Sequence, residues 1–218
     1  MEQQGRGSGA RCPVGLSHAA RLARGVLGAQ AHSHRPAHIR RTSLAAPQVL
    51  RDAHGVTPAF EPVVWPDDAQ AAIEFLTSNE WPFHGTASLT HDQAAQVSVA
   101  GDDIASFWIR ADTETIGLIR AFDLDDLDVG SPLFDLRIAE HHRGRGVGRT
   151  AVAWLTDHLF TTYSELHRIE ATTRHDNVAM QRVLESCRYR LEGRMLEAWR
   201  NADGTRSDTL IYAILRRE

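Results

Sequence analysis

The sequence predicts a mixed α/β (α+β) fold, in which helices flank a mostly antiparallel sheet of six to seven strands. From Thr57 onward, apolar runs of strand length alternate with helical patterns in the order β-α-α-β-β-β-α-β-α-β-β. In addition, a strand-like run at 133–138 passes through a glycine-rich turn directly into an amphipathic helix. With 218 residues, 42% of them hydrophobic, the chain is long enough to bury one core.

The elements expected before the glycine-rich turn follow from local signals. Pro66, Asp67 and Asp68 are residues that open helices, Thr90 is a helix cap, and the turn at 111–114 joins two apolar runs into a hairpin. The predicted elements are a strand at 60–65, a helix opened by 66–68, a helix from 91 to about 99, and strands at 104–110, 115–122 and 133–138. The first helix contains Ala71, Ala72, Phe75 and Leu76.

The elements expected after the turn begin with the clearest helix of the chain. Its apolar residues recur at helical spacing on one face, namely Val147, Ala151, Trp154, Leu155, His158 and Leu159. The remaining predicted elements are a strand at 168–173, a helix at 177–187, and two strands at 189–199 and 208–215.

Residues 1–56 differ from the rest, so we predict two regions: an Arg-rich, disordered extension at 1–56 and a single folded domain at 57–218. The extension has eight arginines against Glu2 and Asp52, a charge of +6, which leaves −4 − 6 = −10 for the domain. Its Gly, Ala, Ser, Arg and His content shows no sustained period. A targeting segment, a nucleic-acid arm and an artefact of the assigned start site stay open as alternatives.

Composition narrows the class of protein further. Cys12 and Cys187 are the only cysteines and lie far apart, so a disulfide framework is not expected and a cytoplasmic location is. The apolar runs are far shorter than the roughly 20 residues of a membrane-spanning helix. No aromatic residue precedes Phe60 for base stacking, so we expect no nucleic-acid partner. The 12 histidines show no metal-ligand spacing, so no metal is expected.

The turn Arg143-Gly144-Arg145-Gly146-Val147-Gly148 carries most of the functional information. Glycines let backbone N–H groups approach an anion, and the helix N-terminus adds partial positive charge, so the turn suits a phosphate or pyrophosphate. A P-loop needs a lysine, and this chain contains none. A dinucleotide fingerprint needs a sixth-position glycine, where Arg149 stands, and it belongs to a domain's first strand–turn–helix. The alternative is that the turn only connects the strand to the helix and binds no ligand.

The pattern Arg143-x-x-Gly146-x-Gly148, in this order of elements, resembles the pyrophosphate loop of the Gcn5-related N-acetyltransferase (GNAT) family, and within it the RimJ/RimL-like branch. The resemblance covers about residues 57–216. It implies transfer of an acetyl group from acetyl-CoA to a primary amine of a small molecule or of a protein N-terminus. A homodimer is left open.

The resemblance also implies which residues bind the cofactor. Backbone groups of the turn would hold the pyrophosphate, the strand edge would pair with the pantetheine arm, and the Asn that opens the next helix would contact the cofactor. The implied residues are Leu136, Arg137, Ile138, Arg143, Gly144, Arg145, Gly146, Val147, Gly148, Arg149 and Asn177. Asn177 fits a helix N-cap equally well. Replacing Gly146 with valine is expected to abolish CoA binding with little loss of fold.

Catalysis requires a base, since an ammonium has no lone pair, and the strand residue Glu170 is the first candidate. Asp123, Asp125 and Glu80 are further candidates. The loop Glu80-Trp81-Pro82-Phe83-His84 is where the resemblance places the acceptor pocket, so Glu80, Trp81 and His84 are predicted to bind substrate. An aromatic cluster beside a carboxylate suits a cationic amine. Alternatively, Trp81 and Phe83 only anchor the loop to the core.

The proton donor for the leaving thiolate is not assigned, because the chain departs from the family there. Leu184 stands where many members carry Tyr, Met180 where RimL-like members carry Ser, and Arg188 where Gly is common. Cys187 or Tyr189 could donate a proton, although both also suit packing. These departures keep open a different class of function, a CoA-binding sensor of the same fold without turnover.

Overall fold

The computed structural model describes residues 58–125, 127 and 130–216. The predictions made for the extension at 1–56 therefore lie outside the described residues.

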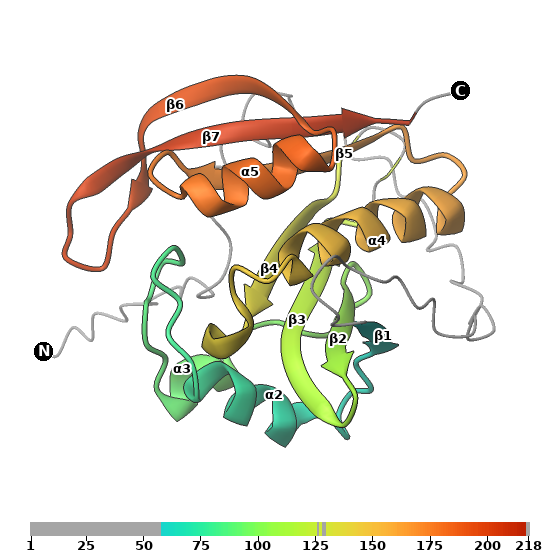
Figure 1. Cartoon of the computed structure of the whole chain (residues 1–218), viewed down its shortest axis with the longest axis vertical. Helices are drawn as coiled ribbons and strands as arrows, with labels where there is room; N and C mark the ends of the chain where they lie inside the picture. Colours follow the sequence, from blue (N-terminus) through green and yellow to red (C-terminus); the bar gives the residue numbers. More distant parts are fainter. Residues whose placement is uncertain (1–57, 126, 128–129, 217–218) are drawn as a thin grey trace, which may run out of the picture.

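The fold class is confirmed, and the seven strands divide into two antiparallel sheets of four and three strands (Figure 1). The first sheet is a meander in the order β1-β2-β3-β4, in which each strand pairs with the next along the chain. Its strands are β1 (Ala59–Pro62), β2 (Ala105–Ala111), β3 (Glu114–Phe122) and β4 (Leu133–Ile138).

The second sheet has the order β5-β7-β6, so the last strand of the chain is the central one. Its strands are β5 (Arg168–Arg174), β6 (Arg190–Arg200) and β7 (Arg206–Leu215). The two sheets meet where the backbone N–H of Glu170 donates to the carbonyl oxygen of Pro132 at 3.0 Å, just before β4 begins. Within the described residues, β4 itself has one strand partner, β3, so its other edge is unpaired.

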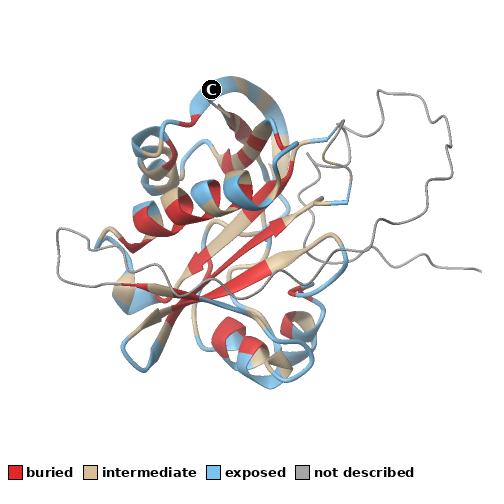
Figure 2. Cartoon of the chain, turned by 90° about the vertical axis from the view of Figure 1, so that its right-hand side faces the viewer, coloured by how far each residue is buried: buried red, intermediate tan, exposed pale blue. Residues whose placement is uncertain are grey.

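Helices cover both faces of the first sheet. The helix α4 (Val147–Thr162) packs on one face, where its Val147, Ala151 and Leu155 join a core with alternate residues of the strands. On the opposite face lie α2 (Ala69–Thr77) and α3 (His91–Ala95), which enclose a second core. The helix α5 (Val178–Ser186) lies beside β7, and α2 and α3 lie at the opposite end of the molecule (Figure 1). Figure 2 shows the buried residues gathered where helices meet strands.

One predicted helix is shorter than expected. A capping box between Thr90 and Gln93 starts α3 as predicted, but the helix ends at Ala95 instead of near Val99. Val97 and Val99 are both buried while Ser98 between them is exposed, which is the alternation of an extended segment. The burial of two β-branched valines therefore favours an extended backbone here, although the sequence pattern is helical.

Candidate active site

The unpaired edge of β4 forms one wall of the candidate site. Leu136, Arg137 and Ile138 lie on this edge, as the sequence predicts. On the other side of the strand, β3 approaches unusually closely at Gly117, which pairs with Ile138. A Cβ atom on Gly117 would lie 2.8 Å from the carbonyl oxygen of Arg137, closer than real Cβ atoms come. The glycine therefore fixes where the edge of β4 lies.

The glycine-rich turn follows β4 after a short 3-10 helix, η1 (Glu140–His142), and its backbone requires glycine at two positions. Gly144 has a φ of 73° and Gly146 a φ of 86°, both in the left-handed region. Gly146 is the N-cap of α4, so no side chain caps this helix end, and the first turn has no acidic residue. The free N–H groups and the positive end of the helix dipole are thus available to an anion.

The left-handed φ of Gly146 changes one expectation from the sequence. A valine there would strain the backbone, because a β-branched residue at positive φ is a conformational outlier. Gly146→Val would therefore impair the fold as well as any ligand binding, and it does not separate the two effects.

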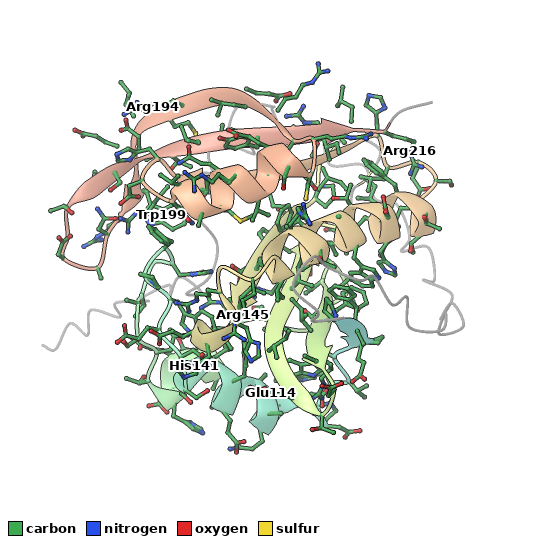
Figure 3. The ribbon with its side chains drawn as sticks, in the orientation of Figure 1. Glu114, His141, Arg145, Arg194, Trp199 and Arg216 are labelled. Atoms are coloured by element: carbon green, nitrogen blue, oxygen red, sulfur yellow. The ribbon has the colours of Figure 1, made fainter. Side chains whose placement is uncertain are left out.

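The arginines of the turn have different roles. Arg145 and Arg149 have exposed side chains, and Figure 3 shows Arg145 on the turn that leads into α4. Arg143 is also exposed, but its side chain joins two backbone segments. Its Nε donates to the carbonyl oxygen of Ile138 at 2.9 Å, and its Nη2 donates to the carbonyl oxygen of Glu80. Val147 is fully buried in the core, so only its backbone can contact a ligand.

A cavity of about 210 Å³ joins the edge of β4, the glycine-rich turn, the start of α5 and the loop at 79–84. Its lining consists of Trp81, Pro82, Phe83, His84, Leu136, Arg137, Ile138, His142, Arg143, Gly144, Gly148, Asn177, Ala179 and Met180. The structure thus brings together most of the residues predicted for the cofactor and two of those predicted for the substrate. Glu80, Arg145, Gly146, Val147 and Arg149 lie beside this cavity in sequence but do not line it.

Asn177 is a helix N-cap, which is one of its two predicted roles. Its side-chain oxygen accepts from the backbone N–H of Met180 at 3.2 Å, so it is the N-cap of α5. It also lines the cavity, together with Met180. The position where RimL-like proteins often carry Ser is thus an apolar part of the wall.

The loop at 79–84 closes over the cavity and is held from several sides. Trp81 is 2% exposed, and its indole N–H donates to the carbonyl oxygen of Leu76 at 2.8 Å. Arg137 and Arg143 stack over the Trp81 ring at 5.1 and 5.5 Å. The ring face predicted to receive a cationic amine is therefore already covered by two guanidinium groups, which agrees with the anchoring alternative for Trp81.

Glu80 and Phe83 do not form the predicted pairing of a carboxylate and an aromatic ring around a cationic amine. The Glu80 side chain is exposed, and the residue contributes its backbone carbonyl, which accepts from Arg143. Phe83 lines the cavity with Arg174 stacked on its ring at 5.3 Å, and the same arginine donates to the carbonyl oxygen of Pro82 at 3.3 Å. Arg174 ends β5, so the loop is tied to both sheets.

His84 is held by Asp135, a residue that sequence reasoning did not single out. The His84 Nε2 lies 2.9 Å from Asp135 Oδ1, while Arg120 Nε and Arg137 Nε each lie 3.1 Å from Asp135 Oδ2. Burial alone would raise the pKa of Asp135, but its neighbours Arg137, His84 and Arg120 outweigh this and hold the pKa well below the ordinary value. The available signal was a pair of charged residues, Asp135 and Arg137, alternating within an otherwise apolar strand.

Glu170, the first candidate for the base, does not line the cavity. It lies on β5, where Arg168 Nε donates to its Oε1 at 2.8 Å. Asp123 and Asp125, which follow β3, are also outside the lining. Among the described residues that line the cavity, none carries a carboxylate side chain, so the lining is basic and apolar.

The two candidates for a proton donor both belong to the core side of α4. The hydroxyl of Tyr189 lies 2.9 Å from Thr156 Oγ1, and burial raises the Tyr189 pKa. Burial likewise raises the pKa of the Cys187 thiol, which contacts the carbonyl oxygen of Arg149 at 3.4 Å. Neither lines the cavity, and Leu184 is fully buried. Both residues therefore serve packing in this structure.

Two further observations concern metals and membranes. In the part of the chain that the structure describes, no group of three or more His, Cys, Asp or Glu side chains is arranged to hold a metal ion. No helix of the described residues is long and apolar enough to cross a membrane.

Comparison with known proteins agrees with this geometry. A family model described as an acetyltransferase (GNAT) domain matches residues 48–190. Several solved structures share the fold. RimJ of Mycobacterium smegmatis in complex with CoA-disulfide has a TM-score of 0.63 and 24% identity, over 78% of this chain and 86% of that one. No curated protein sequence matches the chain.

Two other solved structures match at lower identity. Spermidine N-acetyltransferase from Vibrio cholerae, in complex with CoA and spermine, has a TM-score of 0.60 and 19% identity, over 72% of this chain and 95% of that one. RimL, a ribosomal L7/L12 alpha-N-protein acetyltransferase in complex with CoA, has a TM-score of 0.63 and 16% identity, over 74% and 96%. At these identities the likeness concerns the fold alone.

Proposed function

Because the chain belongs to the GNAT acetyltransferase family, we propose that it is an N-acetyltransferase, which transfers the acetyl group of acetyl-CoA to a primary amine. Family membership supports the coarser class, an acyltransferase with a CoA-based donor. The acetyl group and the amine acceptor are our own assignment. We keep the cytoplasm as its location, since two distant cysteines give no disulfide framework.

One observation carries the proposal: a single cavity joins the unpaired edge of β4 to the glycine-rich turn before α4. An unpaired strand edge offers backbone N–H and C=O groups at regular spacing, which suits the amides of a pantetheine arm. The uncapped N-terminus of α4, with two left-handed glycines, suits a pyrophosphate. These features fit CoA in the order in which its parts are linked.

Different residues of this chain would orient the donor, bind its phosphates and exclude water. The backbone of 136–138 would orient the donor, and the backbone of the turn, with Arg145 and Arg149 nearby, would bind its phosphates. The roof made by Trp81 and its two stacked arginines would exclude water from the reacting end. Asn177 and Met180 would contact the donor from the opposite wall.

The charge of the cavity bears on the acceptor. A polyamine carries several positive charges, and a site for it would need carboxylates. The lining instead contains arginines and histidines, and Asp135, the carboxylate that contacts two of these lining residues, is already shared by Arg120, Arg137 and His84. We therefore propose an acceptor with a single amine, either a small molecule or a protein N-terminus, in preference to a polyamine.

The test is CoA binding by calorimetry combined with thiol release from acetyl-CoA on a panel of amines. The panel contains a monoamine, peptides with free N-termini, and spermidine. We expect CoA binding and turnover on a monoamine or peptide, with little turnover on spermidine. Propionyl-CoA, as a second donor, tests the preference for acetyl. CoA binding without turnover on any amine would favour the sensor without catalysis, and absence of CoA binding would contradict both.

A further inference from the structure

Three cavity-lining residues carry a buried nitrogen that has no hydrogen-bond partner. These atoms are His84 Nδ1, Arg137 Nη1 and His142 Nδ1. Buried polar atoms in proteins are almost always paired, so each such atom calls for an explanation. Because all three residues line the cavity, we take a group of the substrate as the missing partner.

The state of His84 follows from its contact with Asp135. Asp135 is ionised, because the arginines on either side favour its charged form, and an ionised carboxylate can only accept hydrogen bonds. The His84 Nε2, 2.9 Å from Asp135 Oδ1, must therefore carry the proton of that contact. In a neutral imidazole the other nitrogen then has a lone pair. That nitrogen is Nδ1, the unpartnered atom.

His84 has no carboxylate competitor in the cavity. Glu170 is outside the lining and paired with Arg168, and no lining residue within the described chain has a carboxylate side chain. His142 is the other imidazole. Its Nε2 lies 3.2 Å from Glu114, whose side chain is 65% exposed, whereas the Asp135 side chain is 17% exposed. Asp135, the less exposed of the two carboxylates, holds its histidine in a more fixed orientation.

We propose that His84, oriented by Asp135, is the general base that accepts the proton of the acceptor ammonium group. His84 is then the catalytic residue and Asp135 a positioning residue. The inference rests on the proposed function, because it needs an amine acceptor.

The reaction balances with these groups. One proton moves from the acceptor ammonium to Nδ1 of His84 and from there to water. The amine nitrogen, now with a free electron pair, forms a bond to the thioester carbonyl carbon. The carbon–sulfur bond breaks and its electron pair stays on sulfur, which receives a second proton from the amine nitrogen. The products are an amide, a thiol and one released proton.

Several charged groups lie next to Asp135 or to the loop that carries His84. Asp135 of β4 contacts the imidazole, and Arg120 of β3 and Arg137 of β4 contact the same carboxylate. Arg143, after β4, and Arg174, at the end of β5, bind the carbonyls of the loop that carries His84. Among these groups, Asp135 is the one in direct contact with the imidazole.

The decisive variant is His84→Gln, with His91→Gln as the matched control, since His91 is exposed on α3. We expect His84→Gln to bind CoA normally and to lower kcat/KM about 10²- to 10³-fold at pH 7. Without the base, reaction requires amine that is already neutral. The deficit should therefore shrink as the pH approaches the pKa of the acceptor, whereas wild type reaches a plateau earlier.

The outcomes separate this inference from the proposed function. If wild type shows no turnover, the proposed function fails. If wild type is active and His84→Gln keeps its rate and pH profile, His84 is not the base. A loss in His142→Gln alone, with His84→Gln unaffected, would move the role to His142 and overturn the proposal.

The role of Asp135 is tested on the wild-type protein by NMR of ¹⁵N-labelled histidine, with the His84 signals identified by their loss in His84→Gln. We expect the neutral tautomer with the proton on Nε2. A tautomer with the proton on Nδ1 would mean that Asp135 does not prepare His84 to accept a proton.

Discussion

Gly117 on β3 and Arg137 on β4 are packed backbone against backbone, with room for no side chain between them. A Cβ atom on Gly117 would meet the Arg137 carbonyl oxygen at 2.8 Å and the Cδ1 atoms of Ile109 and Ile138 at 2.9 and 3.0 Å. The carbonyl is part of the strand whose free edge lines the cavity. The position of that edge therefore depends on a residue that does not itself touch the cavity.

We predict that Gly117→Ala lowers the free energy of unfolding by about 1–3 kcal/mol, because it overpacks a site that backbone atoms close. Because relief requires β4 to move, CoA affinity should fall as well. Urea denaturation and calorimetry measure the two effects. Gly193→Ala on β6, where nothing lies within 4 Å of the added atom, is the control and should change both by little. Equal behaviour of the two variants would contradict the close packing.

The exposed arginines of the turn should act through long-range charge. Arg145→Gln combined with Arg149→Gln is expected to weaken CoA binding several-fold at low salt, since exposed charges contribute about 0.3–1 kcal/mol each. Salt screens such interactions, so the difference from wild type should shrink with increasing ionic strength. Calorimetry in a salt series measures it. Arg190→Gln, exposed on β6, is the control. A deficit that does not depend on salt would point to direct side-chain contact instead.

Tyr189 should be dispensable for catalysis. Tyr189→Phe removes a hydroxyl that contacts Thr156, whose own hydroxyl keeps its bond to the Val152 carbonyl at 2.8 Å. We expect a loss of stability of about 0.5–1.5 kcal/mol and an unchanged kcat. Thermal unfolding and steady-state kinetics check the two parts. A large fall in kcat with stability retained would identify Tyr189 as the missing proton donor.

The ion-paired Asp135 should make stability depend on acid pH. Its pKa is lower in the folded protein than in the unfolded chain, so its contribution is fully present above about pH 4 and is lost as the pH falls through the folded pKa. Asp135→Asn leaves Arg120 and Arg137 without their carboxylate, and we expect it to cost about 3–5 kcal/mol at pH 7.

The same variant should lose less additional stability than wild type on acidification from pH 5 to pH 3. Urea denaturation at several pH values measures this, with the exposed Asp67→Asn as control. If wild type and Asp135→Asn lost stability in parallel over this range, another carboxyl group would dominate the acid response.

Local patterns were sufficient for most of the fold. The apolar run at 133–138 and the helical spacing from Val147 onward predicted β4 and α4 with the correct starts, and Thr90 marked the start of α3. The end of α3 was not predictable locally, because burial of Val97 and Val99 against α2 and Trp108 decides it. The division into two sheets was likewise not predictable locally. It depends on β4 and β5 not pairing with each other along their length, which is decided by the packing of the whole fold.

In the candidate site, too, some features follow from local sequence and others from tertiary contacts. The β4 edge and the glycine-rich turn follow one another in sequence, Asn177 opens the helix after the next strand, and residues of all three line one cavity. Glu170 was chosen for its strand, but its partner Arg168, two residues away on the same strand, holds it in an ion pair instead. The contact between His84 and Asp135 spans 51 residues, and the sequence alone does not show that a loop folds back onto a strand.

The loop at 79–84 is fixed through its main chain: Arg143 binds the carbonyl of Glu80, and Arg174 binds the carbonyl of Pro82. Every residue type has a carbonyl, so these ties place few demands on the side chains at positions 80 and 82, which are exposed. Substitutions there can alter what the rim of the cavity admits while the roof keeps its position. The choice of acceptor can thus diverge among descendants of this protein without refolding the site.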